Sequence, residues 1–145
     1  MAFQGYLLKA GNTVFPHNYI QYEKFSTTPN IREEIEAYRD DYTRALYRVT
    51  APGHVTTFKF TVKDGLHSAD IKAIKDFFTS ATVNAEQRKV QLTYWNMEDM
   101  TYKTSYFYRP DINYTIRQIT GNDFICNEFD IEFIEYDPLN ATVVS

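Results

Sequence analysis

The amino-acid sequence predicts a mainly β protein, a β-sandwich or split barrel flanked by one α-helix at about residues 68–80. Three observations support this fold class. The chain has 12 Tyr, 11 Phe and 1 Trp, and aromatic side chains favour the pleated surface of a strand. Several segments alternate apolar and polar residues, whereas one segment repeats apolar residues at helical spacing. A chain of 145 residues supports one core, so we expect a single domain over residues 1–145.

The first part of the chain predicts two short strands, over residues 5–9 and 19–25. Between them lie the turn dipeptide Gly11-Asn12 and Pro16, which resists a central strand position.

Residues 26–41 fit two structures, a helix and one strand of a long hairpin. In the helix, Asn30 would be the N-cap with Glu33 three residues later. Its apolar stripe would consist of Ile31, Ile35 and Tyr38. In the hairpin, the chain would turn at Asp40-Asp41 and return over residues 43–50. Because so few residues define the stripe, we favour the hairpin, an extended arm at about residues 26–50.

The middle of the chain gives the clearest periodicities. Phe58, Phe60 and Val62 alternate with Thr57, Lys59 and Thr61, which indicates a strand with one buried face. After Asp64-Gly65, Ser68 is the expected N-cap of the helix. The apolar face of this helix consists of Ile71, Ile74, Phe77 and Phe78. A helix this short needs a sheet to pack against.

The remaining chain predicts four strands, over residues 89–95, 101–108, 111–119 and 127–136. In the last of them, Phe129, Ile131 and Phe133 alternate with Glu128, Asp130 and Glu132. This strand should therefore bury one face and expose carboxylates on the other.

Composition and charge exclude several functions. Fifteen Lys and Arg against 19 Asp and Glu give a formal charge of −4, and no basic run occurs. Tight binding of DNA or RNA depends on such cations, as does binding to an anionic membrane, so we expect neither. No apolar stretch is long enough for a membrane helix. We therefore expect a soluble protein made inside the cell, with no membrane partner.

The sequence contains no recognisable catalytic or metal-binding motif. His17, His54 and His67 lie far apart and lack the spacing of metal ligands. Cys126 is best interpreted as a small buried hydrophobic residue. We predict that the protein is not an enzyme and has no metal or cofactor.

Two groups of residues are candidate surfaces. Tyr94, Trp95, Tyr102 and Tyr106 lie in one predicted hairpin. They would pack in the core or form an exposed platform for a sugar ring or a neighbouring subunit. Glu128, Asp130 and Glu132 stand about 7 Å apart along one strand face. That face would either keep the protein soluble or line a pore that repels a polyanion.

The order and spacing of several short motifs resemble small tail-module proteins of long-tailed bacteriophages and prophages of Gram-positive bacteria. The motifs are Gly5-Tyr6-Leu7-Leu8, Phe15-Pro16, Thr28-Pro29-Asn30, Tyr38-Arg39-Asp40, Tyr94-Trp95-Asn96, Tyr102-Lys103-Thr104, Phe107-Tyr108, Pro110-Asp111 and Ile134-Glu135-Tyr136. The resemblance implies the tail-tube fold and a hexameric ring around a DNA channel. It also implies that the arm reaches a neighbouring subunit through Ile35, Tyr38, Tyr42 and Tyr47.

We therefore predict a structural subunit of a phage tail, in the tube or the distal-tail adaptor, with Glu128, Asp130 and Glu132 facing the channel. Its partners would be its own copies and neighbouring tail proteins of tube, hub or tape-measure type. DNA would pass without tight binding, and the protein would assemble in the host cytoplasm into the virion tail. The alternatives are a carbohydrate-binding tail module that uses the exposed aromatics, and a monomeric barrel that holds a small apolar ligand.

Overall fold

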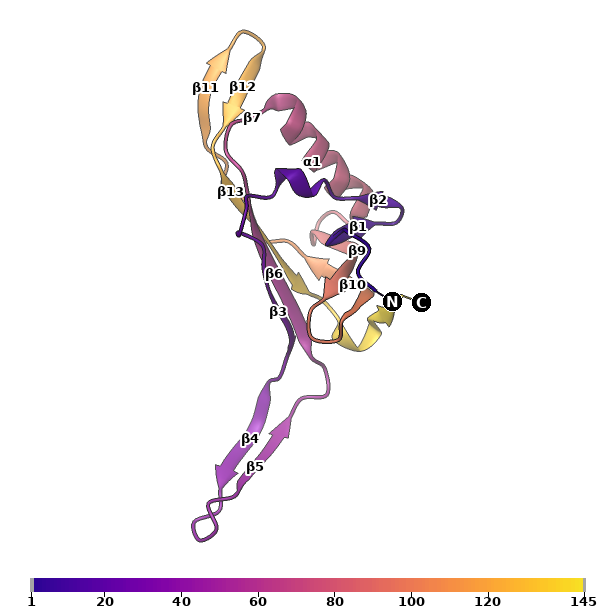
Figure 1. The fold of residues 1–145 in the computed structure, drawn as a ribbon, viewed down its shortest axis with the longest axis vertical. Coiled ribbons are helices and arrows are strands. Elements are labelled where there is room, and N and C mark those ends of the chain that lie inside the picture. Colours follow the sequence, from indigo (N-terminus) through magenta and orange to yellow (C-terminus); the bar gives the residue numbers. More distant parts are fainter. Residues whose placement is uncertain (1, 145) are drawn as a thin grey trace.

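The computed structural model describes residues 2–144, which form a mainly β protein with one α-helix, as the sequence predicts (Figure 1). The elements are β1 (Leu8–Ala10), β2 (Thr13–Val14), η1 (His17–Tyr19), β3 (Ser26–Ile31), β4 (Glu34–Arg39), β5 (Leu46–Thr50), β6 (Val55–Val62), β7 (Leu66–His67), α1 (Ser68–Ala81), β8 (Thr82–Asn84), β9 (Lys89–Asn96), β10 (Thr101–Tyr108), β11 (Ile116–Thr120), β12 (Asp123–Cys126), β13 (Phe129–Glu135), η2 (Pro138–Asn140) and β14 (Thr142–Val143).

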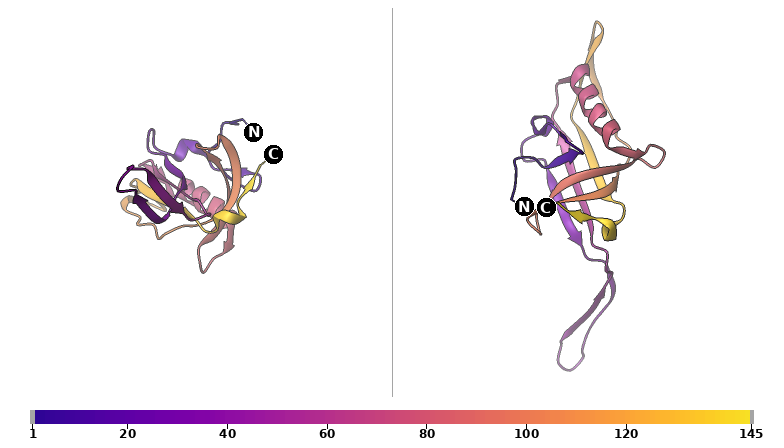
Figure 2. Two further views of the ribbon diagram at one scale, coloured as in Figure 1. Left: turned by 90° about the horizontal axis from the view of Figure 1, so that it is seen from below. Right: turned by 90° about the vertical axis from the view of Figure 1, so that its right-hand side faces the viewer.

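The main sheet is antiparallel and has the strand order β2-β1-β9-β10-β13-β6-β3. β10 and β13 pair only at Phe107–Glu135 and Tyr108–Ile134, so the sheet turns a corner there. As a result β9 and β10 cross β6 and β13 in the side view (Figure 2). We call β2-β1-β9-β10 the first half-sheet and β13-β6-β3 the second half-sheet.

The core lies between the two half-sheets and is built mainly from aromatic rings. The Phe58 ring, on β6, lies 5.1 Å from the Phe107 ring on β10 and 6.1 Å from the Tyr94 ring on β9. Helix α1 contributes Phe78, whose ring lies 5.7 Å from Phe133 on β13. The predicted alternation of β13 is confirmed, because Phe129, Ile131 and Phe133 are buried.

Helix α1 buries the predicted face, but its first turn is capped differently. His67 occupies the N-cap position and Ser68 is the first helical residue. The carboxylate of Asp123, on β12, accepts hydrogen bonds from the backbone N–H (3.0 Å) and the hydroxyl (2.6 Å) of Ser68. These bonds, together with one from His67, hold the pKa of Asp123 well below its usual range. The N-cap therefore lies one residue before the predicted one, and Asp123, a residue distant in sequence, supports the first helical residue.

Three predicted strands differ from the structure. The strand predicted over residues 5–9 is shorter and shifted, since β1 spans Leu8–Ala10. Residues 19–25 do not form a strand, since η1 and a left-handed residue, Glu23 (φ 63°), bend the chain and leave only the bridge Ile20–Val62. The strand predicted over 111–119 begins at Ile116, and it pairs with the additional strand β12.

Residues 26–50 form three strands and a turn, so the helix considered for this region is wrong. Residues 26–31 form β3, an edge strand of the main sheet, and the free part of the predicted arm begins after it. Pro29 suits an edge strand because it cannot donate to a further neighbour. Asn30 has φ 53°, a left-handed conformation that asparagine tolerates and a helix does not allow.

The molecule is elongated, with a hairpin at each end of its long axis (Figures 1 and 2). The arm, which consists of β4, β5 and their turn, projects from one end, and the β11–β12 hairpin lies at the other. The two chain termini lie together beside the first half-sheet. No helix within residues 2–144 has the length and apolar character needed to cross a bilayer.

Candidate functional site: the arm, its base and the acidic face

The arm is a two-stranded antiparallel hairpin, and neither of its edges pairs with another strand within residues 2–144. Tyr38 pairs with Tyr47, and their rings stack at a centroid distance of 5.2 Å. An irregularity between Glu34 and Glu36 shifts the register near the base. Opposed residues in an antiparallel pair share a face, so Tyr38, Tyr47 and Val49 lie on one side of the arm.

The tip of the arm turns where the sequence predicts, and Asp40 holds its shape. The Asp40 carboxylate accepts the backbone N–H groups of Tyr42 (2.9 Å) and Thr43 (2.8 Å). The bond from Thr43, followed by that from Tyr42, lowers the pKa of Asp40. Arg44, with φ 64°, completes the turn. Tyr42 is thereby presented on an ordered turn with 95% of its surface exposed.

Large apolar side chains are clustered on the exposed surface of the arm. Its exposed large side chains are Ile35, Tyr38, Tyr42, Leu46, Tyr47 and Val49. All four predicted arm residues are among them. An isolated two-stranded hairpin is marginally stable in water, and clustered exposed apolar residues mark interaction sites. These properties are typical of a segment that is stabilised by contact with a partner.

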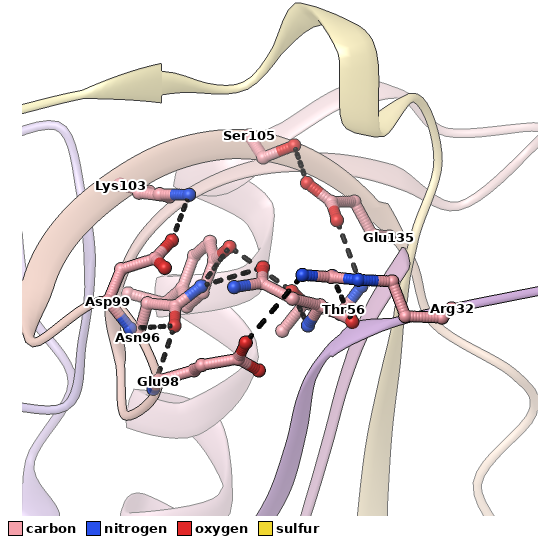
Figure 3. A network of polar contacts seen from close by, with 10 residues as sticks. Arg32, Thr56, Asn96, Glu98, Asp99, Lys103, Ser105 and Glu135 are labelled. Carbon is pink, nitrogen blue, oxygen red and sulfur yellow. Dashed lines mark hydrogen bonds and ion pairs between the residues drawn. The ribbon is translucent and has the colours of Figure 1, made fainter. Parts of the chain in front are cut away.

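A network of polar groups fixes the base of the arm to the rest of the fold (Figure 3). Asn96, at the end of β9, is 1% exposed. Its amide donates to Asn30 Oδ1 (3.2 Å), and its oxygen accepts the backbone N–H groups of Glu98 and Asp99 (both 3.0 Å). Arg32, just past β3, lies 3.8 Å from Glu98. The residues that lead into the arm are therefore tied to the β9–β10 turn.

Glu135 holds the other strand at the arm's base. It is 5% exposed, and its Oε1 accepts the backbone N–H of Thr56 at 2.9 Å. Its Oε2 accepts the Ser105 hydroxyl at 2.6 Å. The Thr56 hydroxyl in turn accepts the backbone N–H of Asn30 at 3.1 Å. The network thus connects β3, β6, β10 and β13 at the point from which the arm projects.

Charged groups surround a polar pocket of about 200 Å³ beside this network. A hydrogen bond from Lys103, with a further one from Asn30, lowers the pKa of Asp99. Burial raises the pKa of Tyr94, which also lines the pocket. Hydrogen bonding accounts for the pKa shift of Asp99, and burial accounts for that of Tyr94. We therefore interpret the residues around this pocket as a structural support for the arm.

Replacing Asn96 with alanine is expected to lower the free energy of unfolding by about 2 kcal/mol, because it removes a buried side chain that hydrogen-bonds to Asn30, Glu98 and Asp99. Denaturant unfolding measures the loss, and hydrogen exchange at Asn30 and Glu98 should show the base loosening. Asn84→Ala is the matched control, since Asn84 is exposed and accepts one hydrogen bond, from the backbone of Gln87. Equal losses in the two variants would contradict a structural role for Asn96.

The predicted acidic face exists as an exposed side of the second half-sheet. Glu128, Asp130 and Glu132 are exposed, on the side opposite the buried phenylalanines. Asp130 accepts the Thr61 hydroxyl at 2.6 Å and lies 3.5 Å from Lys59. The bond from Thr61, with a smaller contribution from Lys59, lowers the pKa of Asp130. The face is therefore acidic but includes lysine, and it lies on the side of β13 opposite to the buried Glu135.

The alternative of an exposed aromatic platform formed by Tyr94, Trp95, Tyr102 and Tyr106 is wrong. Tyr94, Trp95 and Tyr102 expose only 2%, 7% and 0%. Tyr94 faces the core, whereas Trp95 and Tyr102 lie on the outer side of the first half-sheet, under Phe3 and Tyr6. Tyr106 is half-buried, with the Lys89 ammonium 4.7 Å from its ring. The rings pack the fold.

No metal site is formed within residues 2–144, where no three His, Cys, Asp or Glu residues are grouped to hold an ion. Cys126 is buried, as interpreted from the sequence, and burial raises the pKa of its thiol.

The polar base is the part of the site that sequence reasoning missed. A signal for Glu135 was present, because Glu135 has the same parity on β13 as the buried Ile131 and Phe133. Asn96 begins a turn and could have been predicted to bond to the backbone that follows. The link from Asn96 to Asn30 joins positions that are distant in sequence and depends on the pairing of the whole sheet.

The fold recurs in two solved structures of gene transfer agent (GTA) particles. One is a chain in the virion of a native GTA particle, at a TM-score of 0.51 and 11% identity, with 99% of this chain and 100% of that chain covered. The other belongs to the tail of an empty GTA particle with C6 symmetry, at a TM-score of 0.51 and 10% identity and the same coverage of 99% and 100%. At these identities the likeness shows a shared fold.

No curated protein matches the sequence. The model of DUF6711, a family of unknown function, matches residues 1–136, and the chain therefore belongs to that family.

Proposed function

We propose that this protein is a non-enzymatic structural subunit of a bacteriophage tail, in the tube or in the distal-tail adaptor between tube and baseplate. Copies close into a ring of six around the DNA channel and contact neighbouring tail proteins of tube, hub or tape-measure type. The protein resides in the tail of the virion, after assembly in the host cytoplasm. The sequence resemblance suggests a long-tailed phage or prophage of a Gram-positive bacterium.

The observation that carries this proposal is the full-length likeness to a chain of a C6-symmetric particle tail. The match covers 99% of this chain and 100% of that chain, so it spans nearly the whole length of both. The arm supports the same proposal independently, because its exposed apolar side chains require a partner to cover them. In a closed ring, each subunit offers two different surfaces to its neighbours.

The acidic face supports a role as the wall of the channel. A surface with carboxylates and threonines lets a polyanion pass, because it lacks the excess of cations that would displace counterions from DNA phosphates. In this arrangement Glu128, Asp130 and Glu132 of every subunit point to the bore, and the arm contacts a neighbouring copy.

Electron microscopy of the purified protein in negative stain tests the ring directly. We expect annular particles with a central hole and six-fold symmetry, and a mass by light scattering that agrees with six chains. Monomers at every concentration, with no annular particle, would contradict the proposal.

Replacing Glu128 with lysine is expected to make assembled rings retain DNA, because one new cation per subunit is repeated around the bore. Retention should fall steeply as salt rises from about 0.05 to about 0.2 M, as counterion release requires. A gel-shift assay measures it. Glu86→Lys, which makes the same charge change at an exposed position between β8 and β9, should leave the rings without affinity. Equal retention by both variants would place Glu128 outside the bore.

A further inference from the structure

Helix α1 lies toward the end of the molecule opposite the arm (Figure 1), and two separate pockets lie beside it. Ile71, Lys75 and Phe78 are spaced four and three residues apart, so they share one side of the helix. On that side lies a pocket of about 270 Å³, lined by Ile71, Lys75, Tyr114, Ile116, Phe124 and Cys126. A second pocket of about 230 Å³ is lined by Phe78, Thr82, Ala85, Arg88, Val90 and Arg109. We call the two pockets together the helix groove.

The helix groove combines apolar walls with positive charge. Among the residues that the structure describes, its charged lining residues are Lys75, Arg88 and Arg109, and no carboxylate side chain lines either pocket. Arg88 pairs with Asp111 at 3.1 Å. Within residues 2–144, Lys75 and Arg109 make no ion pair, and the half-buried Arg109 guanidinium lies 5.3 Å from the Phe78 ring. Ile116 in the wall is 54% exposed. The groove is therefore suited to a segment that is apolar and acidic.

The arm has that chemistry. Residues 33–50 include five carboxylates against three guanidinium groups, a net charge of −2. The carboxylates are Glu33, Glu34, Glu36, Asp40 and Asp41. Tyr42, at the tip, is the most exposed large hydrophobic side chain among the described residues, at 95%. Asp41 precedes it and, within the described chain, takes part in no ion pair.

We infer that the helix groove of one copy binds the arm of a second copy, with Tyr42 in the apolar pocket beside Ile116 and the Asp41 carboxylate near Lys75. This inference rests on the proposed function and names the surface that the arm reaches. Arm and groove lie at opposite ends of the long axis, so the contact is heterologous and joins copies end to end. Opposite charge sets the register of such a contact, and apolar burial provides its affinity.

Site-specific photo-cross-linking tests the contact. A benzophenone amino acid in place of Tyr42 in the assembled protein should cross-link to residues 71–78 or 109–116 of another copy, as peptide mass spectrometry can establish. The inference would be overturned if the cross-links map to other parts of the second copy or only to a different tail protein. It would also be overturned if an assembled sample gives no cross-link.

Charge reversal in the groove gives an independent measurement. Lys75→Glu is expected to weaken association about tenfold, an effect of the size measured for close charge pairs at interfaces. Lys72→Glu is the matched control, since Lys72 lies on the same helix but pairs with Asp76 and does not line the groove. Sedimentation velocity compares the two. Equal association of both variants would overturn the inference.

The two proposals can fail separately. If the wild-type protein forms no ring, the proposed function fails. If the wild type and Lys75→Glu assemble equally well, the ring stands and the arm binds a surface other than the helix groove.

Discussion

Replacement of both Ile35 and Tyr38 with serine is expected to give a folded monomer that no longer forms rings. Their side chains are 68% and 56% exposed, so the core loses nothing when they are shortened. Association loses the apolar area that these side chains would bury, at roughly 25 cal/mol for each Å². Sedimentation velocity and negative-stain images measure assembly, and circular dichroism measures the fold.

Tyr22→Ser is the control for this experiment, because Tyr22 is 86% exposed and lies outside the arm. It should assemble as the wild type does. The single variant Ile35→Ser separates contact from hairpin stability, since it leaves the stack of Tyr38 on Tyr47 intact. If the double variant sediments like the wild type, the arm is not part of the interface.

Phe58→Ala is expected to lower the free energy of unfolding by about 3–5 kcal/mol. Phe58 is 2% exposed and joins the two half-sheets, with its ring 5.1 Å from Phe107 and 5.1 Å from Phe133. Truncation of Phe58 leaves a cavity between the two half-sheets. The half-sheets cannot move together to fill it, because the corner between β10 and β13 fixes their relative position. Equilibrium unfolding in urea measures the loss as a shift of the midpoint at constant slope.

Phe58→Leu provides the comparison, because it keeps most of the volume and should cost about 1–2 kcal/mol. A loss in the alanine variant no greater than in the leucine variant would show that the half-sheets do not depend on this contact.

The sequence was most informative where one face of an element meets water. Helix α1 and strand β13 follow their predicted periodicities, since each has a buried and an exposed side. The turn at Asp40-Asp41 could also be predicted, because the side chain that forms it bonds to the next few residues of the backbone. These features depend on local chemistry and a single apolar face.

Prediction was weakest where both faces of an element are covered. In β9, residues from Leu92 to Asn96 are all buried, so no alternation distinguishes the core from the outer side. The outer side is covered by residues near both ends of the chain, Tyr6 and Val144 among them. The same limit applies to Asn30 and Asn96, whose hydrogen bond depends on how distant strands pair.

Both ends of the chain are fastened to the same tyrosine. The Tyr102 hydroxyl accepts the backbone N–H of Gln4 at 2.8 Å, and the Tyr102 carbonyl accepts the backbone N–H of Val144 at 2.9 Å. A fluorescent label or affinity tag attached to either end would therefore emerge from one and the same patch of the subunit. Two such fusions would report on the same neighbourhood of the particle, and a probe of the arm or the groove has to be introduced within the chain.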